Sequence, residues 1–284
     1  MSQLTLLPMR PKGQLLKWVG NKFRHANEIA SHFPEDYDTF YEPFVGTGAV
    51  LATMAPSDAI ASDTLAPLIE MWHTLQNDPE ALIEHYRRVI TRYEDNPDAT
   101  YEETLRRYNE DPNGRDLVIL SRTCYGGVVR FTKEGKMSTP IGAHSPISPE
   151  KFEARAYRWR DRIQDTAFLN QSFTETMGAA GANDLIYCDP PYLDSQSILY
   201  GSQDFSFEKL LEMITQCKER GAKIALSIDG RKKSGKKEIK LTLPPGVFER
   251  EMYVEGGSSM LKRFQNGGEV MIGEDVQERL LLSW

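Results

Sequence analysis

Cysteine and long apolar runs are scarce in this sequence. Its 284 residues include three cysteines, Cys124, Cys188 and Cys217, and no Cys-x-x-Cys pair. An odd number of widely spaced cysteines argues against a disulfide framework or a cysteine-based zinc site and favours a reducing compartment. No apolar run approaches the roughly 18 residues that a membrane span needs, and the N-terminus lacks the pattern of a secretory signal. We therefore expect a soluble, cytoplasmic protein with no membrane partner.

Basic residues are also in the minority, and histidine is sparse. The formal net charge is -7, which by itself does not favour nucleic acid as a partner. Positive charge is nevertheless concentrated in residues 231–240 and 155–162. Such runs are most often solvated faces, and for 231–240 both a phosphate-binding loop and a disordered tip remain open. The five histidines show no ligand-like grouping, so we expect no metal.

Strand and helix patterns alternate along the chain, without internal repeats. Strands are expected at 39–44, 58–63, 167–173, 185–188 and 223–229, with two more near 247–255 and 277–284. Helices are expected at 49–54, 65–75, 79–107, 150–165 and 207–221. Such alternation predicts an α/β fold with a mainly parallel sheet covered by helices on both faces. We expect residues 1–65 and 165–284 to build the sheet domain, and residues 66–164 to form a mainly helical insert.

A glycine turn follows the first expected strand, in the stretch EPFVGTG that ends at Gly46-Thr47-Gly48. Glycine lets backbone amides approach a ligand closely, and a helix N-terminus favours negative groups. Asp63 ends the next strand, where an acid can bind ribose hydroxyls. The turn matches neither Gly-x-Gly-x-x-Gly nor the Gly-Lys-Ser/Thr ending of a phosphate-binding loop. These residues predict a nucleoside-containing cofactor other than a nicotinamide dinucleotide or ATP.

The strand at 185–188 runs directly into Asp189-Pro190-Pro191-Tyr192. Two prolines end a strand and stiffen the chain that follows. At the carboxyl end of a parallel strand, ligands are expected to bind. The Asp189 carboxylate and the Pro190 carbonyl could accept both hydrogens of an amino group, and the Tyr192 ring could stack on a planar base. A simple strand terminator is the alternative interpretation.

These motifs together resemble the Dam-like, D12-type DNA adenine methyltransferases of the α class. Asp189-Pro190-Pro191-Tyr192 is similar to their catalytic motif, and EPFVGTG to their S-adenosylmethionine motif. Residues 17–22, KWVGNK, resemble their entry segment KWxGGK, in which Asn21 here replaces a glycine. The motif order also matches, with a recognition insert between the cofactor and catalytic motifs. The chain resembles adenine methyltransferases of type II restriction systems as well, so a cognate endonuclease or a solitary bacterial or phage role are both open.

The resemblance implies a role for each matching residue. Catalysis would fall to Asp189, Pro190 and Tyr192, with Tyr192 stacking on a flipped-out adenine. The cofactor S-adenosylmethionine would be bound by Trp18, Lys22, Phe44, Gly46, Gly48, Asp63, Ser172, Phe173 and Asp189. Double-stranded DNA would be bound by a β-hairpin of the insert, through Tyr125, Gly126, Val128, Arg130, Lys133, Lys136 and Pro140. Arg130 would read a guanine, whereas Lys133 and Lys136 would contact phosphates. Gly126 stands where the family motif YNGLxR has asparagine, which removes a polar contact and leaves recognition of part of the site open.

The resulting hypothesis is a site-specific DNA adenine-N6 methyltransferase that acts as a monomer or weak dimer. An N4-cytosine or RNA-base methyltransferase is the enzymatic alternative. The acid at Asp189 favours adenine, because N4-cytosine enzymes more typically carry serine there. A DNA-binding protein with a vestigial catalytic fold is the non-enzymatic alternative, and the intact Asp63 and Asp189 argue against it.

Overall fold

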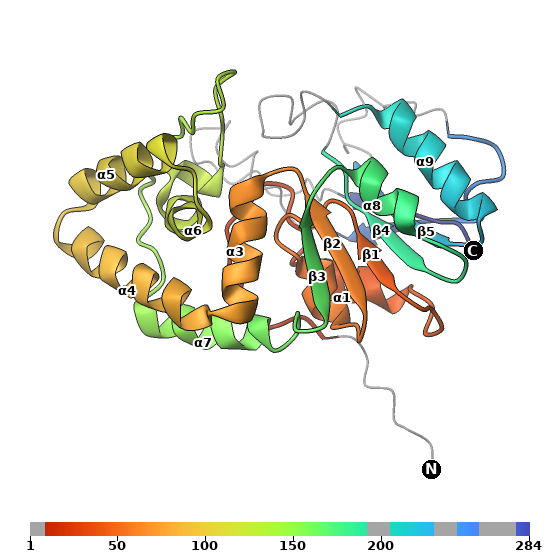
Figure 1. The fold of residues 1–284 in the computed structure, drawn as a ribbon, viewed down its shortest axis with the longest axis horizontal. Coiled ribbons are helices and arrows are strands. Elements are labelled where there is room, and N and C mark those ends of the chain that lie inside the picture. The colour runs from red at the N-terminus through yellow and green to blue at the C-terminus, as the bar shows by residue number, and fades with distance from the viewer. Residues whose placement is uncertain (1–8, 192–204, 230–242, 256–276) are drawn as a thin grey trace, which may run out of the picture.

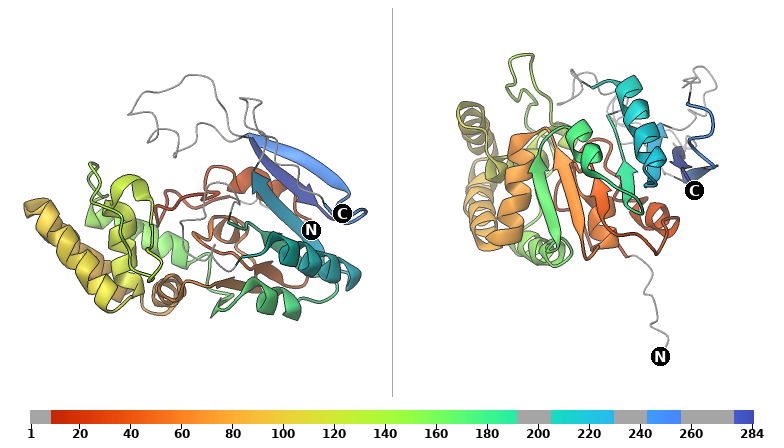
Figure 2. Two further views of the ribbon diagram at one scale, coloured as in Figure 1. Left: turned by 90° about the horizontal axis from the view of Figure 1, so that it is seen from above. Right: turned by 45° about the vertical axis from the view of Figure 1, so that its right-hand side comes forward.

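A seven-stranded sheet organises the sheet domain. The computed structural model describes residues 9–191, 205–229, 243–255 and 277–284 (Figure 1). The strands are β1 (Phe40–Glu42), β2 (Ala59–Asp63), β3 (Thr166–Asn170), β4 (Leu185–Cys188), β5 (Lys223–Asp229), β6 (Arg250–Glu255) and β7 (Gln277–Leu282). Their spatial order is β3-β2-β1-β4-β5-β7-β6. The first five run parallel, and β7 lies antiparallel between β5 and β6 (Figure 2). The predicted α/β fold is confirmed.

Side chains of the central strands alternate between two hydrophobic cores, as the pleat of a strand requires. On β4, Leu185 and Tyr187 belong to one core, whereas Ile186 and Cys188 belong to the other. The first core faces α1 (Ala26–Ser31), α2 (Ala49–Met54) and the helical insert. The second core is covered by α8 (Phe173–Ala179) and α9 (Phe207–Glu219). Burial on both faces explains why these strands read as continuous apolar runs.

Five helices and a hairpin-like loop form the insert, on one side of the sheet (Figure 1). The helices are α3 (Ala66–Asn77), α4 (Pro79–Asp95), α5 (Pro97–Glu110), α6 (Gly114–Thr123) and α7 (Pro149–Arg160). The first core runs without interruption from the insert into the sheet, since Trp72 of α3 stacks on Phe168 of β3 at 5.4 Å. The insert is therefore packed firmly against the sheet. No helix within the described ranges is both long and apolar enough to cross a membrane.

The stretch 79–107, which the sequence predicts to be helical, forms two helices that meet at Asn96. Asn96 ends α4, and its side chain accepts the amide N–H of Ala99 at the start of α5. Pro97 follows at the first position of α5, where its missing N–H leaves no hydrogen bond unmade. The pair Asp78-Pro79 starts α4 in the same way. A capping residue followed by proline thus divides one amphipathic stretch into two helices.

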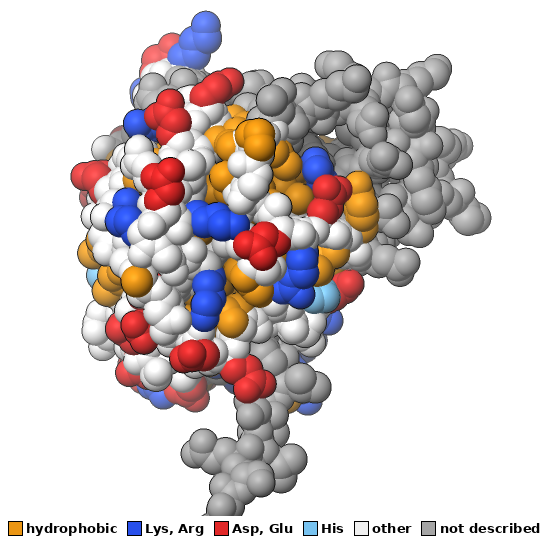
Figure 3. All heavy atoms as spheres, turned by 90° about the vertical axis from the view of Figure 1, so that its right-hand side faces the viewer, with side chains coloured by type: hydrophobic (Ala, Val, Ile, Leu, Met, Phe, Trp, Pro, Cys, Tyr) orange, Lys and Arg blue, Asp and Glu red, His pale blue; other side chains and the backbone are white. Residues whose placement is uncertain are grey.

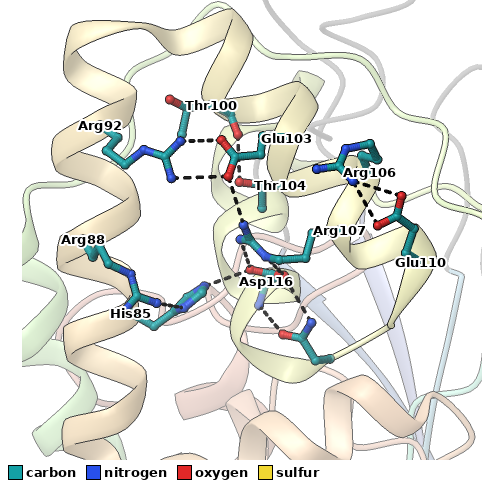
Figure 4. Close-up of polar contacts among 11 residues, drawn as sticks. His85, Arg88, Arg92, Thr100, Glu103, Thr104, Arg106, Arg107, Glu110 and Asp116 are labelled. Atoms are coloured by element: carbon teal, nitrogen blue, oxygen red, sulfur yellow. Dashed lines mark hydrogen bonds and ion pairs between the residues drawn. The ribbon is translucent and has the colours of Figure 1, made fainter.

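A buried carboxylate ties three helices of the insert together (Figure 4). Asp116, 1% exposed, accepts hydrogen bonds from His85 at 2.8 Å and from Arg107 at 2.7 Å. Asn113 adds a third at 3.1 Å. Arg88 contacts the other ring nitrogen of His85, and since a guanidinium has no acceptor, that nitrogen accepts and Nε2 donates to Asp116. Burial alone would raise the pKa of Asp116, but these hydrogen bonds lower it below its ordinary value.

Replacing Asp116 with asparagine is expected to reduce the free energy of unfolding by about 2 kcal/mol near neutral pH, because Arg107 loses its charged acceptor. The folded-state pKa lies below the unfolded one. This contribution is therefore present above about pH 4 and is lost as the pH falls further. Urea unfolding should show that the free energies of unfolding of wild type and Asp116→Asn differ at neutral pH and converge in acid. Asp111, exposed at the end of α5, provides the control Asp111→Asn, which should stay within about 0.5 kcal/mol of wild type. If Asp116→Asn and Asp111→Asn were equally stable near neutral pH, the stabilising role of Asp116 would be contradicted.

Candidate functional site

A cavity of about 240 Å³ opens at the carboxyl edge of the sheet, where β1 and β4 end. Its walls come from the N-terminal segment 18–22, the glycine turn, the start of α8 and the Asp189-Pro190-Pro191 corner. Among the predicted cofactor residues, those that line it are Trp18, Lys22, Phe44, Gly46, Asp63, Ser172, Phe173 and Asp189. The catalytic candidate Pro190 also lines it, whereas Tyr192 lies outside the described residues. The chain thus brings together motifs that are separated by more than a hundred residues.

The two glycines of the turn serve different purposes. Gly46 has φ +45°, and a Cβ there would meet nothing closer than the Phe44 carbonyl oxygen at 4.0 Å, so the turn is open toward the cavity. Gly48, with φ +58°, does not line the cavity. A Cβ on Gly48 would lie 3.1 Å from the Trp72 ring, and the Trp72 indole donates a hydrogen bond to the Gly46 carbonyl at 3.1 Å. Gly48 therefore allows α3 to pack beneath the turn, and its predicted contact with a cofactor finds no support in this position.

Asp63 closes the cavity at the end of β2. Its two carboxylate oxygens accept the backbone N–H groups of Gly46 at 3.2 Å and Leu65 at 3.0 Å. The Asn170 side chain binds the Asp63 carbonyl at 3.0 Å. Asp63 is 7% exposed, and these bonds fix the direction of its carboxylate. Such an acid suits the binding of vicinal hydroxyls.

Aromatic rings form the apolar wall of the cavity. Phe44 stacks on Phe173 with ring centroids 5.2 Å apart, and Phe205 meets both rings at 5.8 Å. Ser172 begins α8 through a capping box with Glu175, which fixes the position of Phe173. A planar heterocycle is the kind of group that such rings bind.

Lys22 connects the N-terminal segment to the catalytic motif. Its ammonium Nζ lies 2.7 Å from Asp189 Oδ1 and 3.2 Å from Glu278 Oε1, and it is 4% exposed. Burial would lower the pKa of Lys22, but the two carboxylates outweigh it and raise the pKa to about 12. Lys22 therefore stays charged beside Asp189. The sequence assigned Lys22 to a cofactor; in the structure it lines the cavity and also contacts Asp189 directly.

Glu42 is a second acid in the cavity wall that the sequence analysis did not single out. One of its carboxylate oxygens accepts the backbone N–H of Leu51 at 2.9 Å. Burial, followed by repulsion from Asp189, raises the pKa of Glu42 well above its ordinary value, despite the opposing Leu51 hydrogen bond. The protonated form of Glu42 is therefore favoured more than that of an exposed glutamate. Its place in the EPFVGTG stretch was the available sequence signal, whereas nothing in the sequence pointed to Phe205.

The predicted hairpin projects from the insert beyond α6 (Figure 1). Two antiparallel bridges, Cys124 with Ile141 and Phe131 with Met137, close it. Among its predicted DNA residues, the exposed ones are Tyr125, Arg130, Lys133, Lys136 and Pro140, and Gly126 is half-buried. Val128 is 5% exposed, and its carbonyl accepts the Thr139 hydroxyl. The burial of Val128 is that of a core residue, so its side chain does not fit the predicted contact with DNA.

The base of the hairpin packs against the N-terminal segment that leads into the cavity. A Cβ on Gly127 would lie 2.8 Å from Cβ of Lys17, the neighbour of Trp18. Arg122, in the last turn of α6, donates hydrogen bonds to the carbonyls of Gln14 at 3.2 Å and Leu15 at 2.6 Å. The exposed loop and the cavity are therefore joined through one short stretch of backbone.

The side of the molecule around α9 has a different electrostatic character. Acidic and basic side chains are interspersed over the described part of this face (Figure 3). On α9, Lys209 pairs with Glu212 and Lys218 pairs with Glu249, both at 3.0 Å. Pairing of this kind is typical of a solvated face. The hairpin is thus the better candidate for a surface that contacts an anion.

Comparisons with known proteins show which family the chain resembles. The sequence model of the family described as D12 class N6 adenine-specific DNA methyltransferase matches residues 18–244. A DNA N-6-adenine-methyltransferase of Escherichia phage P1 is 28% identical over 229 residues, which cover 76% of this chain and 30% of the relative. A DNA adenine methylase of Vibrio cholerae is 29% identical over 189 residues, covering 65% of this chain and 66% of the relative. The chain spans less than two thirds of either protein. Among solved structures, the rRNA methyltransferase aviRa from Streptomyces viridochromogenes aligns with 95% of this chain and with 89% of its own chain, at 14% identity. The TM-score of that alignment is 0.39, which is too low to support a conclusion about function.

Proposed function

We propose, from the premise that the chain belongs to the D12 class N6 adenine-specific DNA methyltransferase family, that it methylates the N6 amino nitrogen of adenine at specific sites in duplex DNA. The motif resemblance to this family is confirmed. The observation that carries the proposal is that Asp189 and Pro190 line the same cavity as Gly46 of the glycine turn and Asp63. An amino-group acceptor pair and a nucleoside site thus share one cavity.

The cavity suits S-adenosylmethionine. The space above Gly46 admits a ligand close to the backbone, the Asp63 carboxylate suits ribose hydroxyls, and the Phe44 and Phe173 rings suit an adenine. Trp18 and Lys22 complete the wall. When bound, S-adenosylmethionine supplies a methyl group that its sulfonium already activates for in-line displacement.

Asp189 and Pro190 act on the amino nitrogen of the target. The lone pair of that nitrogen is delocalised into the purine ring, so it is a weak nucleophile. The Asp189 carboxylate and the Pro190 carbonyl accept its two hydrogens, which favours tetrahedral geometry and frees the lone pair. Lys22 keeps the Asp189 carboxylate oriented, so that the contribution is chiefly positioning and electrostatic stabilisation. An adenine inside a duplex cannot reach this cavity, so it must be flipped out.

The exposed hairpin is proposed to contact the duplex. Arg130 can donate two hydrogen bonds to guanine O6 and N7, while Lys133 and Lys136 contact phosphates. The backbone of Arg130 is held by the Thr139 hydroxyl and by Ser138, each at 3.0 Å, so the side chain projects from a fixed point.

The Gly46→Ala variant tests the cofactor site. Its methyl group would enter the open space above the turn, so the affinity for S-adenosylmethionine should fall about tenfold, or about 1.4 kcal/mol. Gly246→Ala is the matched control, because Gly246 also has positive φ (+76°) but is exposed and remote from the cavity. Both variants should lose about 1 kcal/mol of stability, but calorimetric titration should show weaker binding for Gly46→Ala alone. Unchanged binding by Gly46→Ala would remove the turn from the cofactor site.

The nature of the acceptor is tested by transfer of a labelled methyl group from S-adenosylmethionine to unmethylated duplex DNA, to the same duplex with adenine replaced by unsubstituted purine, which has no amino group, and to RNA of the same sequence. We expect label in the adenine-containing duplex alone. Label in the adenine-free duplex would indicate cytosine as the target, and label in RNA alone would overturn DNA as the substrate. Binding of the methyl donor without transfer to any of the three would favour a vestigial fold.

A further inference from the structure

Strand β7 brings an acid to the active edge of the sheet from the far end of the chain. Because β7 runs antiparallel to β5, its beginning lies beside the carboxyl ends of the parallel strands. Glu278 is the second residue of β7. Leu280 and Leu282, which share its face, lie in the core that also contains Trp18. Glu278 therefore faces the N-terminal segment, 256 positions away from the Lys22 that it contacts.

Three acceptors contact the ammonium of Lys22 and fix its orientation. Besides Asp189 at 2.7 Å and Glu278 at 3.2 Å, its ammonium donates to the Gly20 carbonyl at 3.1 Å. An ammonium has three hydrogens, and these three acceptors come from three separate parts of the chain. A fully occupied ammonium has little freedom to rotate away from Asp189.

Removing one carboxylate changes what the ammonium does to the other. With Glu278 present, the positive charge of Lys22 is shared between two carboxylates, both buried to a large extent. Without it, Asp189 is the one carboxylate that remains of the pair, and more of the attraction of the ammonium falls on Asp189. The Asp189 carboxylate would then turn toward Lys22 and become a weaker acceptor for an amino group. Misplacement of a reacting group by about 1 Å can reduce a rate by about a hundredfold.

We propose that Glu278 is a positioning residue for Asp189, acting through Lys22, in the reaction proposed above. Glu278 does not itself line the cavity; it contacts the lining residue Lys22, whose ammonium it shares with Asp189. The inference rests on the proposed methyl transfer, and it assigns the C-terminal strand a part in that reaction.

The first test compares Glu278→Gln with wild type and with Glu251→Gln. The control Glu251→Gln removes the same charge from the adjacent strand β6. There, Glu251 pairs with Arg279 on the exposed side. Glu278→Gln should lower kcat on the order of tenfold, with the affinity for S-adenosylmethionine, measured by calorimetry, changed less than about threefold. Glu278→Asp, which keeps the charge, should recover part of the loss. Glu251→Gln should match wild type in both measurements.

The decisive test reverses the sign of the effect. In Lys22→Met, Asp189 and Glu278 are left close together without a cation between them, so they repel. Adding Glu278→Gln to Lys22→Met should therefore raise kcat, whereas the same change lowers kcat when Lys22 is present. A double-mutant cycle of this kind isolates the coupling between neighbours, and thermal unfolding monitors whether each variant is folded.

Each outcome has one meaning. A loss of kcat in Glu278→Gln that reverses in the Lys22→Met background supports the inference. Equal losses in both backgrounds, or wild-type kcat in Glu278→Gln, overturn it and leave the proposed function standing. If Glu278→Gln does not fold, the comparison of a second charge-removing variant, Glu278→Ser, with Lys22→Met/Glu278→Ser decides in the same way. A wild-type protein that transfers no methyl group to adenine overturns the proposed function and the inference with it.

Discussion

Replacing Asp189 with alanine is expected to reduce methyl transfer to adenine by on the order of 100- to 1000-fold, because the amino nitrogen loses a preorganised charged acceptor. The fold should survive, since Lys22 retains Glu278 and the Gly20 carbonyl as partners. Single-turnover transfer from labelled S-adenosylmethionine gives the rate, and a filter-binding titration with a duplex gives the DNA affinity. The rate should collapse, and the affinity should remain within a few-fold of wild type.

The matched control is Asp161→Ala. Asp161 follows α7 on the surface, where it pairs with Arg160 and its side chain is 63% exposed. This variant removes the same charge from the same chain and should transfer methyl groups at the wild-type rate. If Asp189→Ala also retains the wild-type rate, the catalytic assignment of the Asp189-Pro190 corner is wrong.

Replacing Arg130 with alanine is expected to relax sequence preference. A bidentate contact with guanine is worth about 1–3 kcal/mol of discrimination, or roughly 5- to 150-fold between the correct and the incorrect base. Transfer rates on the preferred duplex and on duplexes with one altered base pair should therefore converge in Arg130→Ala. The rate on poor sites should change much less than the rate on the preferred one.

Lys133→Ala provides the comparison on the same hairpin. A phosphate contact carries no sequence information, so this variant should weaken binding to all duplexes alike and reduce the salt dependence of binding by about one counterion. A uniform loss in Arg130→Ala, indistinguishable from Lys133→Ala, would make Arg130 a phosphate contact.

Local signals in the sequence were sufficient for the sheet and for most of the cavity. Parallel strands buried on both faces leave continuous apolar runs, and the residues at their carboxyl ends necessarily meet at one edge. For this reason Gly46, Asp63 and Asp189 could be placed together before the structure was known. The division of 79–107 could also have been read, since Asn96-Pro97 is a local capping signal.

Other features depend on contacts that no local pattern encodes. Gly48 looked like part of a ligand turn, but its neighbour is Trp72 from α3, more than 20 positions along the chain. Val128 stood beside exposed motif residues, yet it is buried, and its carbonyl accepts the Thr139 hydroxyl. Glu278 carried no signal because its position follows from the antiparallel pairing of β7 with β5, which joins residues about 50 positions apart. Tertiary pairing decided the place of each of these three residues.

The central claim is most directly tested by mapping methylated bases at single-base resolution in an unmethylated plasmid after incubation with the protein and S-adenosylmethionine. The account predicts N6-methyladenine at one recurring sequence and at no other adenines, and that sequence would show which bases the hairpin reads. Methyl groups on cytosine N4, or a plasmid left unmodified by protein that binds the methyl donor, would contradict it.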